Sequence, residues 1–222
     1  MDTSKIEKRP LPEHHRGFNL SKARKIQETL AKRVEIRPLP LTEVKLVGGV
    51  DVSYMEDRAK AAAVVLDFQT MEQREAKISW TRVAFPYIPT FLAFREAPPI
   101  VQAVQKLENR PHLLLVDGHG VAHPLGCGLA SHVGVLLKIP TVGVAKRLLC
   151  GEVGEFEGRR APIFLGGKIV GMALAPKPGK KLLYVSVGNL ITLDEAVDAV
   201  FRCIREHVQP EPLKIAHQLS RV

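Results

Sequence analysis

Cysteine is scarce in this 222-residue sequence, which has only three: Cys127, Cys150 and Cys203. They lie far apart and form no CxxC pair, which excludes a zinc knuckle and a disulfide framework. So small and odd a number is typical of a reducing compartment, and we therefore expect a cytoplasmic protein with free thiols. Aromatic residues are also few, at 5% of the chain, which argues against an extended platform for stacking bases.

Long apolar runs are missing as well. No run approaches the roughly 20 residues needed to cross a bilayer, so we expect no membrane partner. Residues 1–17 carry basic side chains but have no apolar core behind them, which excludes a signal peptide. The composition is otherwise that of an ordinary globular protein, with 45% hydrophobic residues. We expect residues 1–222 to form a single α/β domain that acts as a monomer.

Acidic residues are in the minority. The chain has 32 Lys and Arg against 23 Asp and Glu, which gives a net charge of +9. An excess of this size is typical of a protein that binds nucleic acid, because basic side chains displace counterions from phosphates. A basic surface kept for solubility explains the charge equally well.

The spacing of apolar residues predicts alternating strands and helices. Helices are expected where apolar residues recur every three or four positions, and strands where they alternate or run together between turns. The first part of the chain is expected to contain helices at residues 20–34, 100–107 and 129–137, and strands at 44–54, 61–68, 75–83, 112–116 and 141–144.

The remainder is expected to add smaller elements. A loop is predicted at 151–158, and a hairpin turns at Gly166-Gly167, between strands 163–165 and 168–170. A strand follows at 182–187. Thr192 and Glu195 form a capping box that opens a helix running to about residue 208. The last residues, from 211 onward, have the composition of a short polar tail.

The order of these elements predicts a fold. Three strands with short links favour an antiparallel meander, and the later strands, joined through helices, favour parallel pairing. This is the order of a ribonuclease H-like mixed sheet flanked by helices. In that architecture the first and fourth strands lie side by side. An acid within the first strand, Asp51, and one at the end of the fourth, Asp117, can then share a metal ion.

Three carboxylates are the candidates for chemistry. Asp51 lies in the apolar strand GGVDVSY, where an unpaired charge is costly to bury. Asp117 ends the run HLLLVD, and Glu96 falls at the edge of a predicted helix. Each has an ordinary explanation: hydrogen bonds or an ion pair with an arginine for Asp51, a turn or cap for Asp117, and interaction with the helix dipole for Glu96. Together, in a basic protein, they favour a Mg²⁺ site that activates water for attack on phosphorus.

Four basic side chains are further candidates. His123 could bind the scissile phosphate or carry protons, or it could be an ordinary loop histidine. His119, between two glycines, fits either role. Lys146, just after the strand TVGVA, could neutralise charge that develops on a phosphate. His217, in KIAHQLS, has the pattern of a surface histidine.

The segment Pro86-Tyr87-Ile88-Pro89 is unusual for its two prolines. They fix the backbone and restrict the preceding residues to extended shapes, so Tyr87 and Ile88 are expected on a stiff turn. Rigid aromatic or apolar side chains are what proteins insert into a base stack. A loop that packs on its own core is the alternative.

Four stretches of the sequence resemble the signature motifs of the endonuclease V family, the deoxyinosine 3′ endonucleases. In chain order they are GVDVSY, PYIPTFLAFREAP, VDGHGVAHP and GVAKRLL. The similarity covers nearly the whole chain, from Leu20 to His217. It implies a ribonuclease H-like catalytic domain that uses Mg²⁺ or Mn²⁺ to nick DNA containing deoxyinosine. The implied cut is at the second phosphodiester bond 3′ to the deaminated adenine.

The resemblance also implies residue roles. Asp51, Glu96 and Asp117 match the family's metal-binding acids, and Tyr87, between Pro86 and Ile88, matches a wedge that fills the space of the lesion base. The family's remaining active-site residues are matched by His123 and Lys146, near the phosphate, and by His217, beside the metal. A pocket for hypoxanthine is implied near Ala84–Phe85 and in the loop that contains Gly118, His119, Gly120 and Gly128.

Two rival functions are compatible with the same residues. One is the same fold acting on another target, such as inosine-containing RNA or branched DNA. The other is a protein that marks lesions without cutting, which the intact set of three carboxylates argues against.

Overall fold

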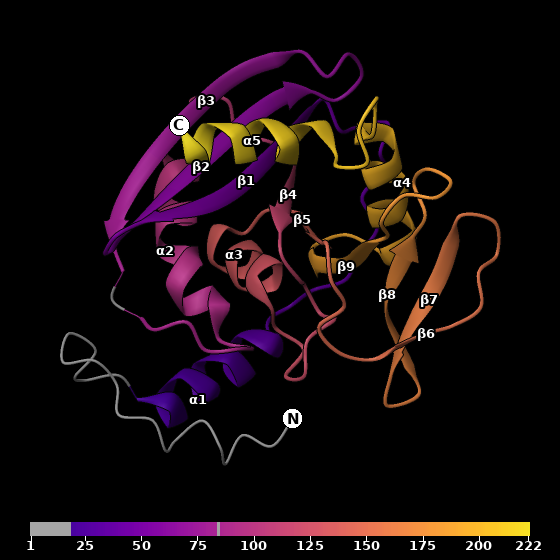
Figure 1. Cartoon of the computed structure of the whole chain (residues 1–222), viewed down its shortest axis with the longest axis horizontal. Helices are drawn as coiled ribbons and strands as arrows, with labels where there is room; N and C mark the ends of the chain where they lie inside the picture. The colour runs from indigo at the N-terminus through magenta and orange to yellow at the C-terminus, as the bar shows by residue number, and fades with distance from the viewer. Residues whose placement is uncertain (1–18, 84) are drawn as a thin grey trace.

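A nine-stranded mixed sheet runs through the computed structural model, which describes residues 19–83 and 85–222 (Figure 1). The strands lie in the order β3-β2-β1-β4-β5-β9-β8-β7-β6. Their bounds are β1 Leu46–Met55, β2 Arg58–Asp67, β3 Gln73–Arg82, β4 Leu113–Asp117, β5 Thr141–Ala145, β6 Glu152–Val153, β7 Arg160–Leu165, β8 Lys168–Leu174 and β9 Leu183–Asn189.

The pairing of the strands confirms the expected fold class. β1, β2 and β3 form an antiparallel meander. β1 then pairs in parallel with β4, and β4 in parallel with β5, so the first and fourth strands are neighbours. The remaining strands, from β9 to β6, extend the sheet in antiparallel fashion. The result is an α/β fold with a mixed sheet flanked by helices.

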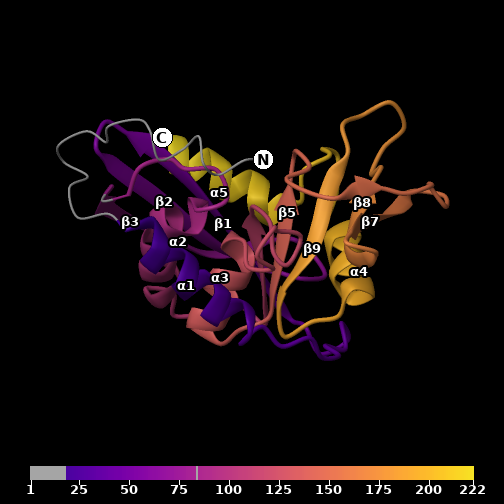
Figure 2. The same ribbon diagram turned by 90° about the horizontal axis from the view of Figure 1, so that it is seen from below.

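Five helices accompany the sheet in the part of the chain that the structure describes. Their bounds are α1 Leu20–Ala31, α2 Leu92–Gln105, α3 Leu129–Leu137, α4 Leu193–Cys203 and α5 Glu211–Arg221. Figure 2 shows α5 on one side of the sheet and α1, α2 and α3 on the other. None of these helices is both long and apolar enough to span a bilayer.

The core has a layer on each face of the sheet, and the alternation of side chains along β4 explains why. Leu113 and Leu115 pack into a cluster with residues of α4 and α5. Leu114 and Val116 point the other way and pack with residues of α2 and α3. All four side chains are fully buried. A strand covered on both faces is expected to be apolar throughout, as β4 is up to its last residue, Asp117.

The predicted start of the second helix is wrong. We expected a helix from residue 100, but α2 starts at Leu92 and contains Pro98 and Pro99. Prolines favour a helix start because they lack the N–H group that an interior position requires. Here the packing of α2 on β2, β3 and α3 outweighs that local preference. Glu96 therefore lies inside the helix rather than at its edge.

The predicted polar tail is also wrong. Residues 211–221 form helix α5, which packs on β1 and β2. Its buried side chains, Leu213, Ala216 and Ser220, recur at helical spacing, a pattern that is weak because one member is a serine. Three smaller differences remain. Helix α1 ends at Ala31 rather than at residue 34, and α4 ends at Cys203 rather than at about residue 208. The short strand β6 lies within the predicted loop 151–158.

Glycine in β1 lets α5 approach the sheet closely. A Cβ added to Gly49 would lie 2.3 Å from the backbone carbonyl of Pro212, in the first turn of α5. A contact this short would force the helix away from the strand. At the neighbouring position of the same strand, the atoms nearest to a Cβ on Gly48 would be side-chain atoms of Leu114 and Pro111.

Gly49→Ala should therefore displace α5 and destabilise the protein. Overpacking of this kind costs about 1–3 kcal/mol of unfolding free energy. Gly48→Ala is the matched control, with the same added methyl group on the other face of β1, and it should cost less. Thermal or urea unfolding of both variants measures the difference. An equal loss in both would mean that the approach of α5 to Gly49 does not limit stability.

Candidate active site

Five candidate residues, four from different elements and one from the loop after β5, line one cleft of about 560 Å³. Asp51 comes from β1, Glu96 from α2, Asp117 from the end of β4, and His217 from α5, while Lys146 follows β5. The parallel register explains the central pair, because Val50 lies opposite Val116 and each is followed by an aspartate. The pairing of β1 with β4 therefore brings together acids that lie far apart in the sequence.

Burial and mutual repulsion set the protonation of Glu96. Its side chain is almost fully buried, and this burial raises its pKa to about 8, with further contributions from Asp51 and Asp117. The hydroxyl group of Tyr54 donates a hydrogen bond to Glu96 Oε1 at 2.8 Å, which opposes the rise. At neutral pH, in the absence of a cation, the carboxyl group is thus largely protonated.

Asp117 is held by a lysine. Lys146 Nζ lies 2.6 Å from Asp117 Oδ2, and its side chain is half exposed at the cleft. Burial raises the pKa of Asp117, while the hydrogen bond and charge of Lys146 lower it. An ion pair that is partly open to solvent can be exchanged for contacts to an incoming ligand.

Helix α5 holds Asp51. His217 Nδ1 and Ser220 Oγ each lie 2.9 Å from Asp51 Oδ2. The two residues are three positions apart and so lie on one face of the helix. Both contacts converge on the same carboxylate oxygen, which fixes the orientation of the side chain in the cleft.

The residues fit a divalent cation. Among the described residues, no group of three or more His, Cys, Asp or Glu side chains is already arranged to hold a metal ion. However, Asp51, Glu96 and Asp117 line one cleft, and the charges of Asp51 and Asp117 both raise the pKa of Glu96. This excess of negative charge, offered by hard oxygen atoms, is what Mg²⁺ or Mn²⁺ would relieve.

Sequence reasoning missed two residues that contact the acids. Tyr54 bonds Glu96, and the guanidinium of Arg95 lies 4.1 Å from the centre of the Tyr54 ring. Ser220 bonds Asp51. Ser220 could have been found from the position of His217 three residues earlier, if the tail had been recognised as a helix. Tyr54 ends the motif GVDVSY, but the sequence does not identify Glu96 as its partner, because that residue comes from α2.

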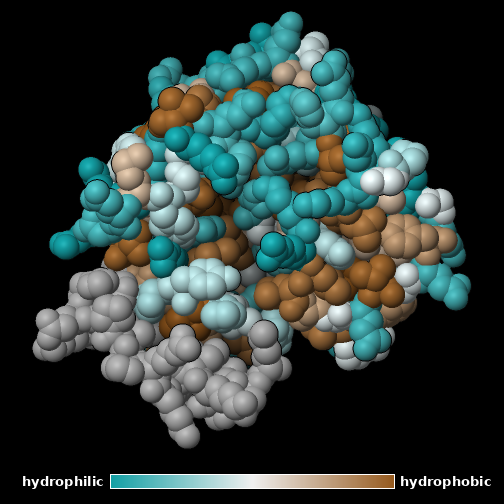
Figure 3. Space-filling view, in the orientation of Figure 1, coloured by the Kyte–Doolittle hydropathy of each residue, from teal (hydrophilic) through white to brown (hydrophobic). Residues whose placement is uncertain are grey.

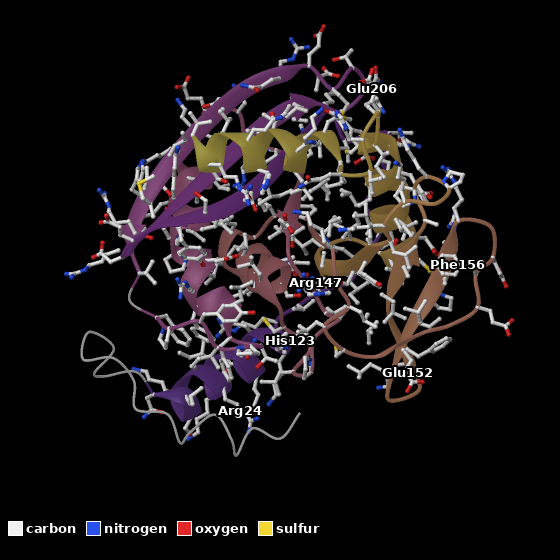
Figure 4. The ribbon with its side chains drawn as sticks, viewed as in Figure 1. Arg24, His123, Arg147, Glu152, Phe156 and Glu206 are labelled. Atoms are coloured by element: carbon white, nitrogen blue, oxygen red, sulfur yellow. The ribbon has the colours of Figure 1, made fainter. Side chains whose placement is uncertain are left out.

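His123 lies outside the cleft. It is buried, and Figure 4 shows it close to α1 and far from α5. Its Nε2 lies 2.8 Å from the carbonyl oxygen of Thr90, and its Nδ1 accepts a hydrogen bond from the backbone of Leu125. Burial lowers its pKa to about 4, so the ring is neutral. The predicted contact of His123 with a phosphate stays a prediction.

The glycines of the loop after β4 make close contacts within the protein. A Cβ on Gly120 would lie 1.9 Å from the carbonyl oxygen of Val187, and one on Gly128 would lie 2.4 Å from that of His119. Gly118 faces the side chain of Leu129. His119 Nε2 lies 3.0 Å from the carbonyl oxygen of Arg147. These glycines therefore allow the loop to pack tightly, and their predicted role in a hypoxanthine pocket stays a prediction.

The proline-flanked turn, residues 86–89, presents one of its two large side chains. Tyr87 is 66% exposed, whereas Ile88 is 5% exposed and packs with Ala23, Phe85 and Phe91. Ile88 thus anchors the turn, contrary to the expectation that it is presented alongside Tyr87. Pro86 is partly buried. Ala84, which was expected near the pocket, lies outside the described residues.

A second cleft, of about 540 Å³, lies beside α4. Its lining includes Arg159, Arg160 and Arg202, together with Phe201 and two acids. None of the predicted site residues lies there. Figure 3 shows that hydrophobic side chains gather nearby over β6–β8, which include the exposed Phe164 and Ile169. The cleft with three neighbouring carboxylates is therefore the better candidate for catalysis.

Known proteins resemble this chain over most of its length. The family model described as Endonuclease V matches residues 28–218. Endonuclease V of Thermofilum pendens is 42% identical over 209 residues, 93% of this chain and 88% of the relative. The crystal structure of Endonuclease V from Streptomyces avermitilis has a TM-score of 0.86 and 39% identity, covering 91% of this chain and 92% of that one.

A third relative was solved with a nucleic acid. Endonuclease V of Ciona intestinalis, in complex with a 24mer DNA containing an inosine followed by a ribo-adenosine, has a TM-score of 0.81 and 30% identity. The match covers 91% of this chain and 96% of that chain. The likeness thus extends over nearly the full length in sequence and in fold, and the chain belongs to the Endonuclease V family of nucleases.

Proposed function

We propose that this nuclease recognises deoxyinosine, the product of adenine deamination, and hydrolyses the second phosphodiester bond on its 3′ side. The observation that carries this proposal is the cleft where Asp51, Glu96 and Asp117 meet beside Lys146. Further support comes from the Ciona relative, which was solved with inosine-containing DNA. The role of the enzyme is then to start the repair of deaminated DNA.

In this mechanism the three carboxylates hold Mg²⁺, for which Mn²⁺ can substitute. When bound, the ion supplies a Lewis acid that lowers the pKa of water and offsets charge on the phosphate. The protein orients its own groups for this task. His217 and Ser220 fix the Asp51 carboxylate, and Tyr54 fixes Glu96. Lys146, half exposed beside Asp117, is positioned to neutralise charge on a phosphate oxygen during hydrolysis.

Base recognition is assigned to the turn at residues 86–89. Tyr87 is exposed on a turn that two prolines stiffen and that Ile88 anchors in the core. In the proposal, Tyr87 fills the gap left when hypoxanthine flips out, and the base enters a pocket at the loop 118–128. The tight packing of Gly120 and Gly128 restricts the conformations that the loop can adopt.

Inosine-containing RNA is the second candidate substrate. The strand bound by the Ciona relative carries an inosine followed by a ribo-adenosine, so ribose at that position is compatible with binding to that relative. We further propose that the protein acts as a monomer in the cytoplasm, where its three cysteines, all unpaired, remain reduced.

The central test is cleavage of matched oligonucleotides. With Mg²⁺ the protein should nick a DNA strand that carries one inosine and leave the adenosine control intact, and EDTA should stop the reaction. Mn²⁺ should restore it. Because burial raises the pKa of Glu96 to about 8, metal binding must displace its proton. The Mg²⁺ concentration for half-maximal rate should therefore fall as the pH rises towards 8 and change little above it.

Two comparisons sharpen this test. Ca²⁺ is larger and a poorer Lewis acid, so it should permit binding with little cutting. An RNA strand of the same sequence distinguishes the second candidate substrate from the first. Equal cutting with EDTA and with Mg²⁺ would reject a catalytic metal, and equal cutting of inosine and adenosine strands would reject lesion recognition.

Asp117→Asn should abolish nicking while substrate affinity stays within a few-fold of wild type. The acid is needed for the metal, whereas contacts to phosphates carry most of the affinity. Asp198→Asn is the matched control, because Asp198 lies on α4 in the other cleft. Single-turnover cleavage and gel-shift assays measure both properties. Substantial nicking by the Asp117 variant would remove this residue from the catalytic site.

Tyr87→Ala should weaken binding to inosine DNA more than binding to undamaged DNA. Loss of one aromatic stacking partner costs about 1–3 kcal/mol, and only the flipped state uses it. Phe156→Ala, which truncates another exposed aromatic side chain, is the control. The measurement is the ratio of the two dissociation constants for each variant. If Tyr87→Ala weakens both complexes equally, the side chain does not read the lesion.

A further inference from the structure

Thr90, the residue that follows the turn at 86–89, has an unusual backbone. Its φ angle is +72°, in the left-handed region. This region is unfavourable for a β-branched residue, because the branched side chain crowds the backbone. Such a conformation persists only where surrounding contacts enforce it. Since Phe91, the next residue, is the N-cap of α2, Thr90 sets the angle between the turn and that helix.

Two side chains hold the carbonyl group of Thr90. Gln27 Nε2 donates to the Thr90 oxygen at 3.0 Å, and His123 Nε2 lies 2.8 Å from the same atom. Since His123 Nδ1 accepts a hydrogen bond from the backbone N–H of Leu125, its proton lies on Nε2, which can donate to Thr90. Residues from α1 and from the loop after β4 therefore converge on one oxygen atom.

Gln27 also connects the turn to the loop after β4. Its Nε2 donates a second hydrogen bond, at 2.7 Å, to the carbonyl oxygen of Cys127. The amide group has two N–H hydrogens, so both are used. The 3.4 Å approach of Gln27 Nε2 to His123 Nε2 is then a contact between neighbouring donors. One side chain thus joins helix α1, the turn and the loop.

Packing alone does not explain a glutamine at this position. Gln27 is completely buried, and its Oε1 has no hydrogen-bond partner among the residues that the structure describes. A buried acceptor without a partner destabilises a protein, and an apolar side chain of similar size would avoid that loss. The two donated hydrogen bonds are therefore the feature that requires an amide here.

We propose that Gln27 and His123 are positioning residues for Tyr87, because they hold Thr90 in its left-handed conformation and so fix the direction in which the turn presents the tyrosine. The inference rests on the proposed function, in which Tyr87 enters the nucleic acid. Ile88, packed in the cluster with Ala23, forms the apolar part of the same attachment to α1. In this arrangement His123 contributes to lesion recognition through the backbone of Thr90.

The test compares Gln27→Leu with wild type in two measurements. Hydrogen–deuterium exchange, without nucleic acid, should be faster in the peptide covering residues 85–92, because the turn is no longer held. Affinity for inosine DNA should fall relative to undamaged DNA. If the turn is in its binding conformation a tenth of the time, the loss is about tenfold. Gln27→Asn, which retains an amide but shortens its reach, is the second variant if leucine prevents folding.

A double-mutant cycle separates positioning from a general loss of structure. If Gln27 acts through Tyr87, the double variant Gln27→Leu, Tyr87→Ala should lose no more lesion discrimination than Tyr87→Ala alone. Leu30→Ala is the matched control, since it truncates another buried side chain of α1 without touching Thr90. It should lower the melting temperature and leave discrimination unchanged.

Three results would overturn the proposal: unchanged exchange at residues 85–92, unchanged discrimination in the Gln27 variants, or full additivity in the cycle. If wild-type protein itself fails to distinguish inosine from adenosine, the proposed function is rejected. The exchange comparison then still shows whether Gln27 holds the turn, so the two failures are distinguishable.

Discussion

The parallel pairing of β1 with β4 is the constraint on which the candidate site depends. Its register sets Val50 opposite Val116 and so makes Asp51 and Asp117 neighbours. Two carboxylates side by side in a partly buried cleft repel each other, and Glu96 from α2 adds a third. The fold tolerates them because each has a partner: His217 and Ser220 for Asp51, Tyr54 for Glu96 and Lys146 for Asp117. Because a cation would offset the repulsion between these carboxylates, the arrangement favours cation binding.

The sequence was sufficient to predict the elements whose signal is local. The meander and the strand that ends at Asp117 follow from apolar patterning and short links, and both are confirmed. The pairing of the first and fourth strands, also confirmed, was predicted from the ribonuclease H-like order of the elements. The family motifs were also needed to place five candidate residues in one cleft, because α2 and α5 supply two of them. The five are Asp51, Asp117, Glu96, Lys146 and His217. Their presence in one cleft is observed, whereas their chemical roles remain proposals.

What the sequence did not predict depends on contacts between distant segments. Helix α2 contains two prolines that would end an isolated helix, and its packing on the sheet overrides them. Helix α5 has too few apolar residues to be recognised alone, because one of its buried positions is Ser220. The glycines after β4 look like a ligand-binding loop in sequence, yet the atoms that Gly118, Gly120 and Gly128 approach belong to α3, to β9 and to the loop itself. Such partners can be identified only in three dimensions.

The close approach of α5 to Gly49 has a consequence for the order in which the protein folds. Helix α5 follows all nine strands in the chain, and its seat on the sheet exists only after β1 and β2 have paired. Helix α5 can therefore take its place only on a sheet whose meander has already formed. His217 and Ser220 reach Asp51 from that helix, so the Asp51 carboxylate is oriented at a late step of folding, after the strand that carries it has been paired.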